Sequence, residues 1–150
     1  MAARSFRVGR SSAGLGLFTV RPIAKKEFIV AYSGQWIPTE EARRRERSRK
    51  ARYMFEVNGR WTIDGSSRRN LGRYANHSCR PNTQAVLRKR TMALVALRPI
   101  AAGEEITFDY GDEYFDLFLK DRGCRCAACA AKAARRNRRR GRSRPTQRRS

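Results

Sequence analysis

The cysteines are the residues whose spacing points most directly to chemistry. The chain has four of them, Cys79, Cys124, Cys126 and Cys129, and the last three fall within six residues. Thiols this close together pair poorly as disulfides. Four thiolates match the ligand set of a tetrahedral structural Zn²⁺ site, provided that the fold brings Cys79 to the other three. The sequence therefore favours a zinc site over four free thiols.

A second candidate is the segment RYANHSCRPN, residues 73–82, which is dense in side chains that form hydrogen bonds. It contains His77, the only histidine of the 150 residues, so any histidine chemistry depends on this one side chain. A lone histidine is more often a hydrogen-bonded structural residue than a catalyst. The density of amide, hydroxyl and imidazole groups around a proline turn predicts that the segment binds a ligand or crosses another segment.

Two further segments are weaker when each is taken alone. The alternating glycines of Gly14-Leu15-Gly16 allow a backbone to approach a ligand closely, although a glycine-rich β-turn is the commoner explanation. In GEEITFDYG, residues 103–111, Phe108 and Tyr110 lie two apart on a predicted strand, so both face one side and could line a pocket wall. By itself, this segment is better explained as a half-buried edge strand.

The elements that must position these residues are mostly short strands. Runs rich in β-forming residues, separated by Gly, Ser and Pro, occur at 6–9, 16–20, 27–32, 53–57, 60–63, 84–87, 92–97 and 105–110. Asn58-Gly59 predicts a hairpin between the fourth and fifth of them, and the sixth and seventh form a second hairpin. Helices are predicted at 39–52, after Pro38, and at 112–120. These elements predict one mainly β domain of small, irregular sheets.

The charge is high and uneven: 35 Lys and Arg oppose 13 Asp and Glu, for a net charge of +22. Residues 130–150 hold ten Lys or Arg, no acid and little apolar area. We therefore predict a disordered tail that keeps the protein soluble or binds polyanions non-specifically. By contrast, seven of the acids lie between residues 104 and 121, around Tyr110. They either solvate a helix or attract a basic substrate.

Two function classes are disfavoured by the pattern of apolar residues. No apolar run approaches the ~20 residues that a membrane-spanning helix needs, and no secretory signal is recognisable, which predicts a soluble intracellular protein. A hydrophobic content of 40%, with seven Phe and five Tyr, is too high for a wholly disordered polycation.

Taken together, the four segments resemble the SET domain of protein lysine methyltransferases over residues 5–129. NHSCRPN at 76–82 is similar to the family's Asn-His-Ser-Cys-x-Pro-Asn segment, and EITFDY at 105–110 to its Glu-Leu/Ile-x-x-Asp-Tyr segment. The resemblance implies a SET-domain fold of several small sheets, with a knot-like crossing of the segments through Asn82 and Tyr110 and one longer helix. It divides the chain into a SET domain (1–121), a zinc-binding post-SET segment (122–131) and a basic tail (132–150).

The resemblance also implies the function: methyl transfer from S-adenosylmethionine to a lysine of a basic protein, such as a histone or histone-like protein. Tyr110, Tyr32 and Phe108 would be catalytic and line a narrow lysine channel, and phenylalanine at 108 implies room for di- or trimethylation. The residues implied for S-adenosylmethionine are Ala13, Gly14, Leu15, Gly16, Tyr53, Arg73, Asn76, His77 and Tyr110. The implied Zn²⁺ ligands are Cys79, Cys124, Cys126 and Cys129.

The alternative function is a catalytically inactive SET-like module that binds nucleic acid or acts as a scaffold through its basic tail. The intact set of Asn76, His77, Phe108 and Tyr110 favours the enzyme. The short gap between Cys126 and Cys129 resembles compact bacterial-type members of the family. The expected location is therefore a bacterial cytoplasm or nucleoid, or the nucleus or chromosome of a eukaryote. The expected partners are a basic protein substrate and, through non-specific contacts of the basic tail, DNA or RNA, with a monomer or small homo-oligomer as the assembly.

Overall fold

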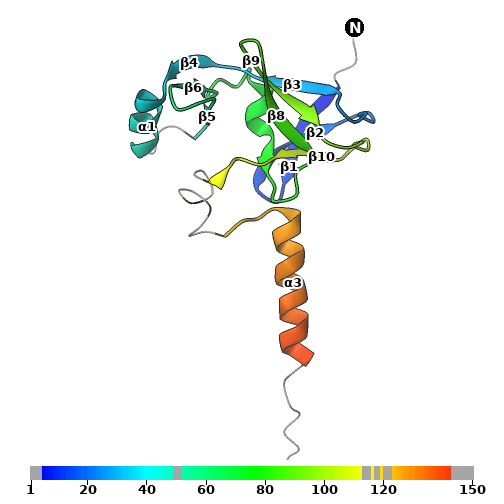
Figure 1. The fold of residues 1–150 in the computed structure, drawn as a ribbon. Helices are drawn as coiled ribbons and strands as arrows, with labels where there is room; N and C mark the ends of the chain where they lie inside the picture. The colour runs from blue at the N-terminus through cyan, green and yellow to red at the C-terminus, as the bar shows by residue number, and fades with distance from the viewer. Residues whose placement is uncertain (1–4, 49–51, 113–115, 117–118, 120–122, 143–150) are drawn as a thin grey trace, which may run out of the picture.

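The computed structural model describes residues 5–48, 52–112, 116, 119 and 123–142, whose strands form three small sheets (Figure 1). The strands are β1 Phe6–Ser11, β2 Gly14–Thr19, β3 Phe28–Tyr32, β4 Gln35–Pro38, β5 Met54–Glu56, β6 Trp61–Asp64, β7 Asn76–His77, β8 Thr83–Arg88, β9 Thr91–Ala96 and β10 Glu105–Phe108. The helices are α1 Thr39–Arg47, the 3-10 helix η1 Leu71–Tyr74, and α3 Ala127–Arg142. The prediction of a mainly β chain is confirmed.

Each sheet has a simple order. The first sheet runs β1-β2-β10-β7, the second β3-β9-β8 and the third β4-β6-β5. All the pairs are antiparallel except β7 with β10, which are parallel. The larger hydrophobic cluster packs residues of the first sheet, including Leu17 and Ile106, against Ile29 and Leu94 of the second. These apolar side chains are almost completely removed from water, so burial between the two sheets stabilises the domain.

Both predicted hairpins are confirmed. The glycine-rich β-turn expected at Gly14-Leu15-Gly16 instead lies two residues earlier in the chain. β5 pairs with β6 across Asn58-Gly59, and β8 pairs with β9. In the β1–β2 hairpin Ser11 lies opposite Gly14, so the turn is made by residues 12 and 13, and both glycines lie in β2. A Cβ on Gly16 would lie 2.5 Å from Glu105 Oε1 and 3.0 Å from Ser11 Cβ, so an alanine there would require the Glu105 carboxylate to shift.

The crossing implied by the resemblance involves β7 and the segment that follows it. Asn76 and His77 pair in parallel with Thr107 and Phe108 of β10. Beyond them, the buried Asn82 donates through Nδ2 to Glu105 O at 2.7 Å and accepts at Oδ1 from Thr107 N–H at 2.9 Å. Local sequence rules disfavour such threaded connections. Here the amide satisfies two backbone groups of β10 at the point where the segments meet.

The helices differ in extent from the prediction. α1 ends at Arg47, and residues 49–51 lie outside the described part of the chain. Glu40 and Glu41 in its first turn and arginines in its last turn follow the helix dipole. The predicted helix at 112–120 falls mostly on residues that the structure does not describe.

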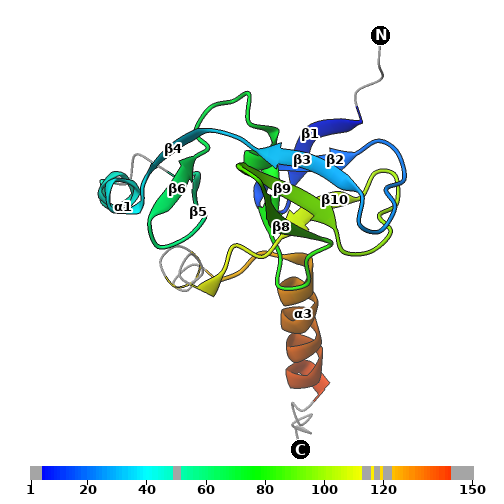
Figure 2. The ribbon, with the colours of Figure 1, turned by 45° about the horizontal axis from the view of Figure 1, so that its top comes forward.

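The prediction of a disordered tail from residue 132 onward is not what the structure has. Residues 132–142 belong to α3, which extends away from the three sheets (Figures 1 and 2). Low apolar content predicted disorder, but alanine and arginine are among the strongest helix formers, and α3 consists largely of these two. Residues 143–150 lie outside the described residues.

Candidate active site and cysteine cluster

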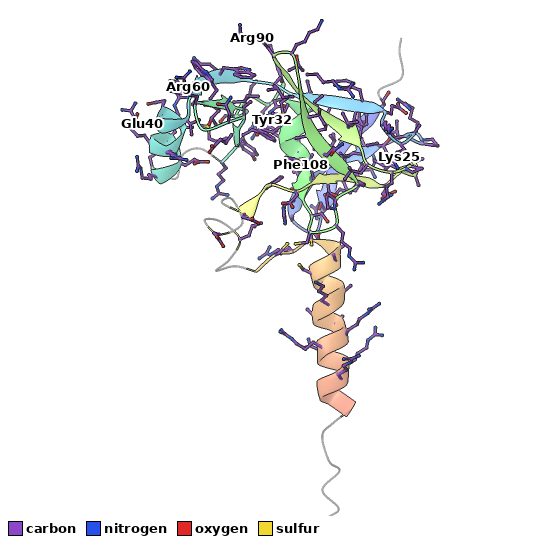
Figure 3. The ribbon with its side chains drawn as sticks, viewed as in Figure 1. Lys25, Tyr32, Glu40, Arg60, Arg90 and Phe108 are labelled. Atoms are coloured by element: carbon purple, nitrogen blue, oxygen red, sulfur yellow. The ribbon has the colours of Figure 1, made fainter. Side chains whose placement is uncertain are left out.

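Four aromatic rings lie in a row through the centre of the domain. The ring centroids of Tyr32 and Phe55 are 5.1 Å apart, those of Phe55 and Phe108 5.9 Å, and those of Phe108 and Tyr110 4.7 Å. Figure 3 labels Tyr32 and Phe108, which come from β3 and the end of β10. The three residues predicted to line the lysine channel are thus gathered into one row. Phe55 was not predicted as a site residue, and its position two residues after Tyr53 on a predicted strand was the available signal.

Tyr110 is held at both its ring and its backbone. Its hydroxyl donates to Ala75 O at 2.6 Å, and its backbone N–H donates to His77 Nδ1 at 3.2 Å. The His77 and Tyr110 rings also meet edge to face, with centroids 5.5 Å apart. The segment before Cys79 therefore orients the tyrosine that lies two residues after the end of β10.

The protonation of His77 follows from its neighbours. Burial lowers the pKa of this imidazole, and the nearby Asp109 carboxylate opposes the shift only in part. The ring is therefore neutral at pH 7, with an acceptor at Nδ1 because that atom receives the Tyr110 N–H. The proton resides on Nε2, which lies 3.5 Å from Cys79 Sγ. One imidazole thus links Tyr110 to the cysteine cluster.

Asn76 connects the glycine-rich hairpin to β10. Its Nδ2 donates to Leu15 O at 2.9 Å and to Glu105 Oε1 at 2.8 Å. Gly14, which precedes Leu15, has φ +112°. A Cβ on Gly14 would have no atom within 4 Å, so glycine is favoured here by the positive φ and not by lack of space. Gly14 and Leu15 are exposed, Gly16 is buried and Asn76 is half-buried, so this edge presents the backbone of Gly14 and Leu15 beside the Asn76 amide. That edge suits a small ligand with hydrogen-bonding groups.

Arg73 and Tyr53 form the other group that the sequence assigned to S-adenosylmethionine. The Arg73 guanidinium carbon lies 3.8 Å from the centroid of the Tyr53 ring, and Nη1 donates to Ser66 O. Its Nε is buried and has no hydrogen-bond partner among the described residues. A buried donor without a partner is costly, and a ligand acceptor would relieve that cost. Tyr53 also accepts at its backbone oxygen from the Tyr32 hydroxyl at 2.8 Å, which links this group to the aromatic row.

The four cysteines converge as predicted. All four Sγ atoms lie within 4.8 Å of one another, with Cys79 Sγ 3.8 Å from Cys124 Sγ and 3.6 Å from Cys129 Sγ. Zinc–sulfur bonds of about 2.3 Å in a tetrahedron place sulfurs about 3.8 Å apart, so the cluster fits Zn²⁺. Burial raises the pKa of the Cys79 thiol, whereas hydrogen bonds from its neighbours outweigh burial and lower the pKa of Cys126 to about 6.

The cysteine segment also contacts the glycine-rich hairpin. Ser12 Oγ donates to Arg125 O at 3.2 Å, so the turn that carries Ala13 lies beside the cysteine cluster. Cys79 follows His77 by two residues, and Cys129 lies in the first turn of α3. The cluster thus joins the β7 segment, the hairpin and the base of α3.

The acidic residues between 104 and 121 have different roles in the structure. Glu104 pairs with Arg98, and Glu105 binds the Asn76 amide, so these two carboxylates have structural roles. Asp109 is exposed, with its carboxylate 3.7 Å from His77 Nδ1. Asp112 is also exposed, while residues 113 and 121 lie outside the described residues. Asp109 and Asp112, the exposed carboxylates beside Tyr110, both follow β10.

No helix in the described residues is both long enough and apolar enough to cross a membrane.

Comparison with known proteins gives a consistent result. A family model described as the SET domain matches residues 14–111. The H3 lysine-4 specific histone-lysine N-methyltransferase of Debaryomyces hansenii is 34% identical over 122 residues, which cover 75% of this chain and 11% of the relative. Histone-lysine N-methyltransferase SUV39H2 of Xenopus tropicalis is 37% identical over 111 residues, covering 65% of this chain and 27% of that protein.

The fold comparison agrees with the sequence comparison. A solved structure of a humanized mutant of the Chaetomium thermophilum Polycomb Repressive Complex 2, bound to the inhibitor GSK126, superposes with a TM-score of 0.64 at 32% identity. The match covers 74% of this chain and 15% of that chain. The chain spans about a quarter or less of the curated relatives named above. On these matches and on the three-sheet architecture, the chain belongs to the SET domain family.

Proposed function

We propose that this protein is an S-adenosylmethionine-dependent protein-lysine N-methyltransferase that acts on a basic protein. The single observation that carries the proposal is the position of Tyr110, whose hydroxyl and backbone are both held by the segment 75–77. The same segment binds the glycine-rich hairpin through Asn76. A ligand on the hairpin edge and a side chain in the aromatic row would therefore meet at Tyr110.

The residues present suit S-adenosylmethionine. Gly14, Leu15, Gly16, Asn76 and the segment through Ala13 offer polar backbone and amide groups, while Arg73 offers a buried donor beside the Tyr53 ring. When bound, this group supplies a methyl on a positively charged sulfur. His77 is assigned to the same site. Its side chain contacts Tyr110 and Cys79, so its proposed contribution is to hold the loop in place.

The chemistry of methyl transfer fits an aromatic channel. Transfer to an amine is an in-line displacement, so alignment of the two reactants can supply much of the rate acceleration without a covalent enzyme intermediate. The lysine must lose its proton first, and an apolar environment lowers the amine pKa because it disfavours the charged form. Tyr32, Phe108 and Tyr110 are the proposed walls, and the Tyr110 oxygen is the proposed group that orients the amine; the 4.7 Å between the Phe108 and Tyr110 ring centroids and the Tyr110 hydroxyl bond to Ala75 O support this assignment.

The number of methyl groups transferred is proposed from Phe108. Phenylalanine has no hydroxyl to hold a water molecule or to bond the amine, so room remains for a second or third methyl group. Aromatic faces also tolerate a methylated ammonium. We expect di- or trimethylated product, and mass spectrometry that finds only monomethyllysine at excess methyl donor would contradict this part of the proposal.

The substrate class and location are proposed from the relatives. Both curated relatives named above are histone-lysine N-methyltransferases of eukaryotes, which supports a histone substrate and a chromatin location. The expectation of a bacterial source has no support among them. The exposed Asp109 and Asp112 next to Tyr110 are the carboxylates that would attract a basic peptide. The zinc ion is proposed as structural, bound by the four cysteines.

The test is Tyr110→Phe, assayed by radiolabelled methyl transfer to histone H3 and H4 peptides. We expect kcat to fall by roughly 10²-fold or more, in the range typical for loss of one positioned catalytic hydroxyl, with little change in methyl-donor affinity by calorimetry. Tyr74→Phe is the matched control, because Tyr74 packs against the core outside the row of rings. Equal rates for the wild type and Tyr110→Phe would refute the role of the hydroxyl. Absence of methyl-donor binding in the wild type would favour the inactive binding module.

A further inference from the structure

α3 has an asymmetric distribution of charge. Its sequence AACAAKAARRNRRRGR contains seven Lys or Arg and no Asp or Glu. At about 100° per residue, Lys132, Arg135, Arg136 and Arg138 fall within an arc of about 160°. The opposite face carries small or neutral residues, namely Ala130, Ala133, Ala134 and Asn137. The helix therefore concentrates positive charge on one side.

This cationic face is open to solvent. Residues 130–139 are all exposed, and α3 extends away from the sheets, with no other helix or strand of the described residues along its length (Figures 1 and 2). Like charges three and four residues apart destabilise a helix, and α3 has no acid of its own to offset them. A polyanion that follows the helix would remove this repulsion.

We propose that α3 binds duplex DNA through phosphate contacts made by Lys132, Arg135, Arg136 and Arg138. An α-helix with its side chains is about 10–12 Å in diameter, which matches a major groove about 12 Å wide. Lysine and arginine together supply point charges and bidentate donors to phosphate oxygens. The inference does not depend on methyl transfer, because it concerns a surface that lies outside the aromatic row and the hairpin edge.

The composition of α3 disfavours other polyanions. Single-stranded nucleic acid is bound largely by stacking on aromatic side chains, and α3 has none. Double-stranded RNA has a deep, narrow major groove that does not admit a helix. Anionic membranes require Trp, Phe or Leu on the face opposite the charges, and that face has only small or polar residues. Arginine outnumbers lysine on the cationic face, as suits phosphate recognition.

The cysteine cluster gives this helix a fixed base. Cys126 immediately precedes α3 and is buried, Cys129 lies in its first turn, and both are grouped with Cys79 of the domain. A metal ion at the cluster would hold the direction of α3 relative to β7. The DNA-binding face therefore extends from the side of the domain that carries the proposed methyl-transfer site.

The test is a salt titration of DNA binding by the zinc-loaded full chain, followed by anisotropy of a fluorescent duplex of about 20 base pairs. The variant Lys132→Gln, Arg135→Gln, Arg136→Gln, Arg138→Gln removes four charges but keeps good helix formers. Each phosphate contact contributes about 0.9 to the slope of log K against log salt, so we expect the slope to fall by about two to four units. At near-physiological salt the same loss corresponds to roughly 10²-fold weaker binding.

The matched control removes four charges elsewhere: Lys25→Gln, Arg60→Gln, Lys89→Gln, Arg90→Gln. All four side chains are exposed, and Figure 3 shows Lys25, Arg60 and Arg90 on the domain, away from α3. This control should lose far less affinity. A variant with arginines 135, 136 and 138 changed to lysine should retain the slope, and circular dichroism checks the helix in each protein. Equal losses in the two glutamine variants would overturn the proposal, as would equal competition by polyglutamate or single-stranded DNA.

Discussion

Replacing Asn82 by alanine should destabilise the domain strongly, because the Asn82 amide is hydrogen-bonded to the backbone of β10. Its amide satisfies Glu105 O at 2.7 Å and Thr107 N–H at 2.9 Å, and the side chain is 2% exposed. An alanine would leave both backbone groups of β10 without their partner. Each buried unsatisfied group costs about 1–3 kcal/mol, so we expect a loss of about 2–6 kcal/mol in the free energy of unfolding.

The measurement is urea unfolding followed by tryptophan fluorescence, since Trp36 and Trp61 lie in neighbouring strands of the third sheet. The neighbouring residue Gln84 is exposed, and Gln84→Ala should change stability by no more than about 0.5 kcal/mol. An Asn82→Ala protein that loses less than about 1 kcal/mol with an unchanged m-value would refute the reasoning. That outcome would mean that water replaces the amide at the crossing.

If Asn82→Ala does not fold, Thr83→Val still tests the same contact point. Thr83 is buried and donates through Oγ1 to Thr107 O at 2.8 Å. Loss of this one bond should cost about 1 kcal/mol, with the valine methyl retaining the packing. The two substitutions act on the same residue of β10, so the double variant should depart from additivity.

Three further predictions test the packing at Gly34, the ion pair between Glu104 and Arg98, and the metal. Gly34→Ala should cost about 1–3 kcal/mol in thermal unfolding, because its Cβ would lie 2.0 Å from Asp64 O, whereas Gly59→Ala, with open space, should cost far less. Arg98 and the Ala101 N–H hold the pKa of Glu104 below its usual 4.5, so its contribution to stability is present above that pH and is lost on acidification. Glu104→Gln should therefore flatten the fall in stability between about pH 5 and pH 3, and an unchanged acid limb would contradict this. Cys124→Ser, or a strong chelator, should remove zinc measured by mass spectrometry and lower the melting temperature, while a zinc content far below one ion per chain in the wild type would contradict the site.

The sequence alone determined the features that depend on nearby residues or on a motif long enough to be specific. Asn58-Gly59 predicted a hairpin because a two-residue turn is a local property, and the structure has β5 and β6 on either side of it. The cysteine spacing predicted that three thiols lie together, since they are only a few residues apart. The segments at 76–82 and 105–110 indicated the family.

The tertiary structure decided what lies between those segments. Phe55 completes the aromatic row, and the Glu105 carboxylate accepts a hydrogen bond from Asn76 and so has a structural role. Neither contact could be predicted, because pairing between strands brings together residues that are tens of positions apart in sequence. The tail was predicted to be disordered because it has little apolar area to bury. Backbone hydrogen bonding and the helix propensity of alanine and arginine instead make it helical up to Arg142. The composition of a segment determines how much apolar area it can bury. Which residue each side chain contacts is determined only when strands distant in sequence pair.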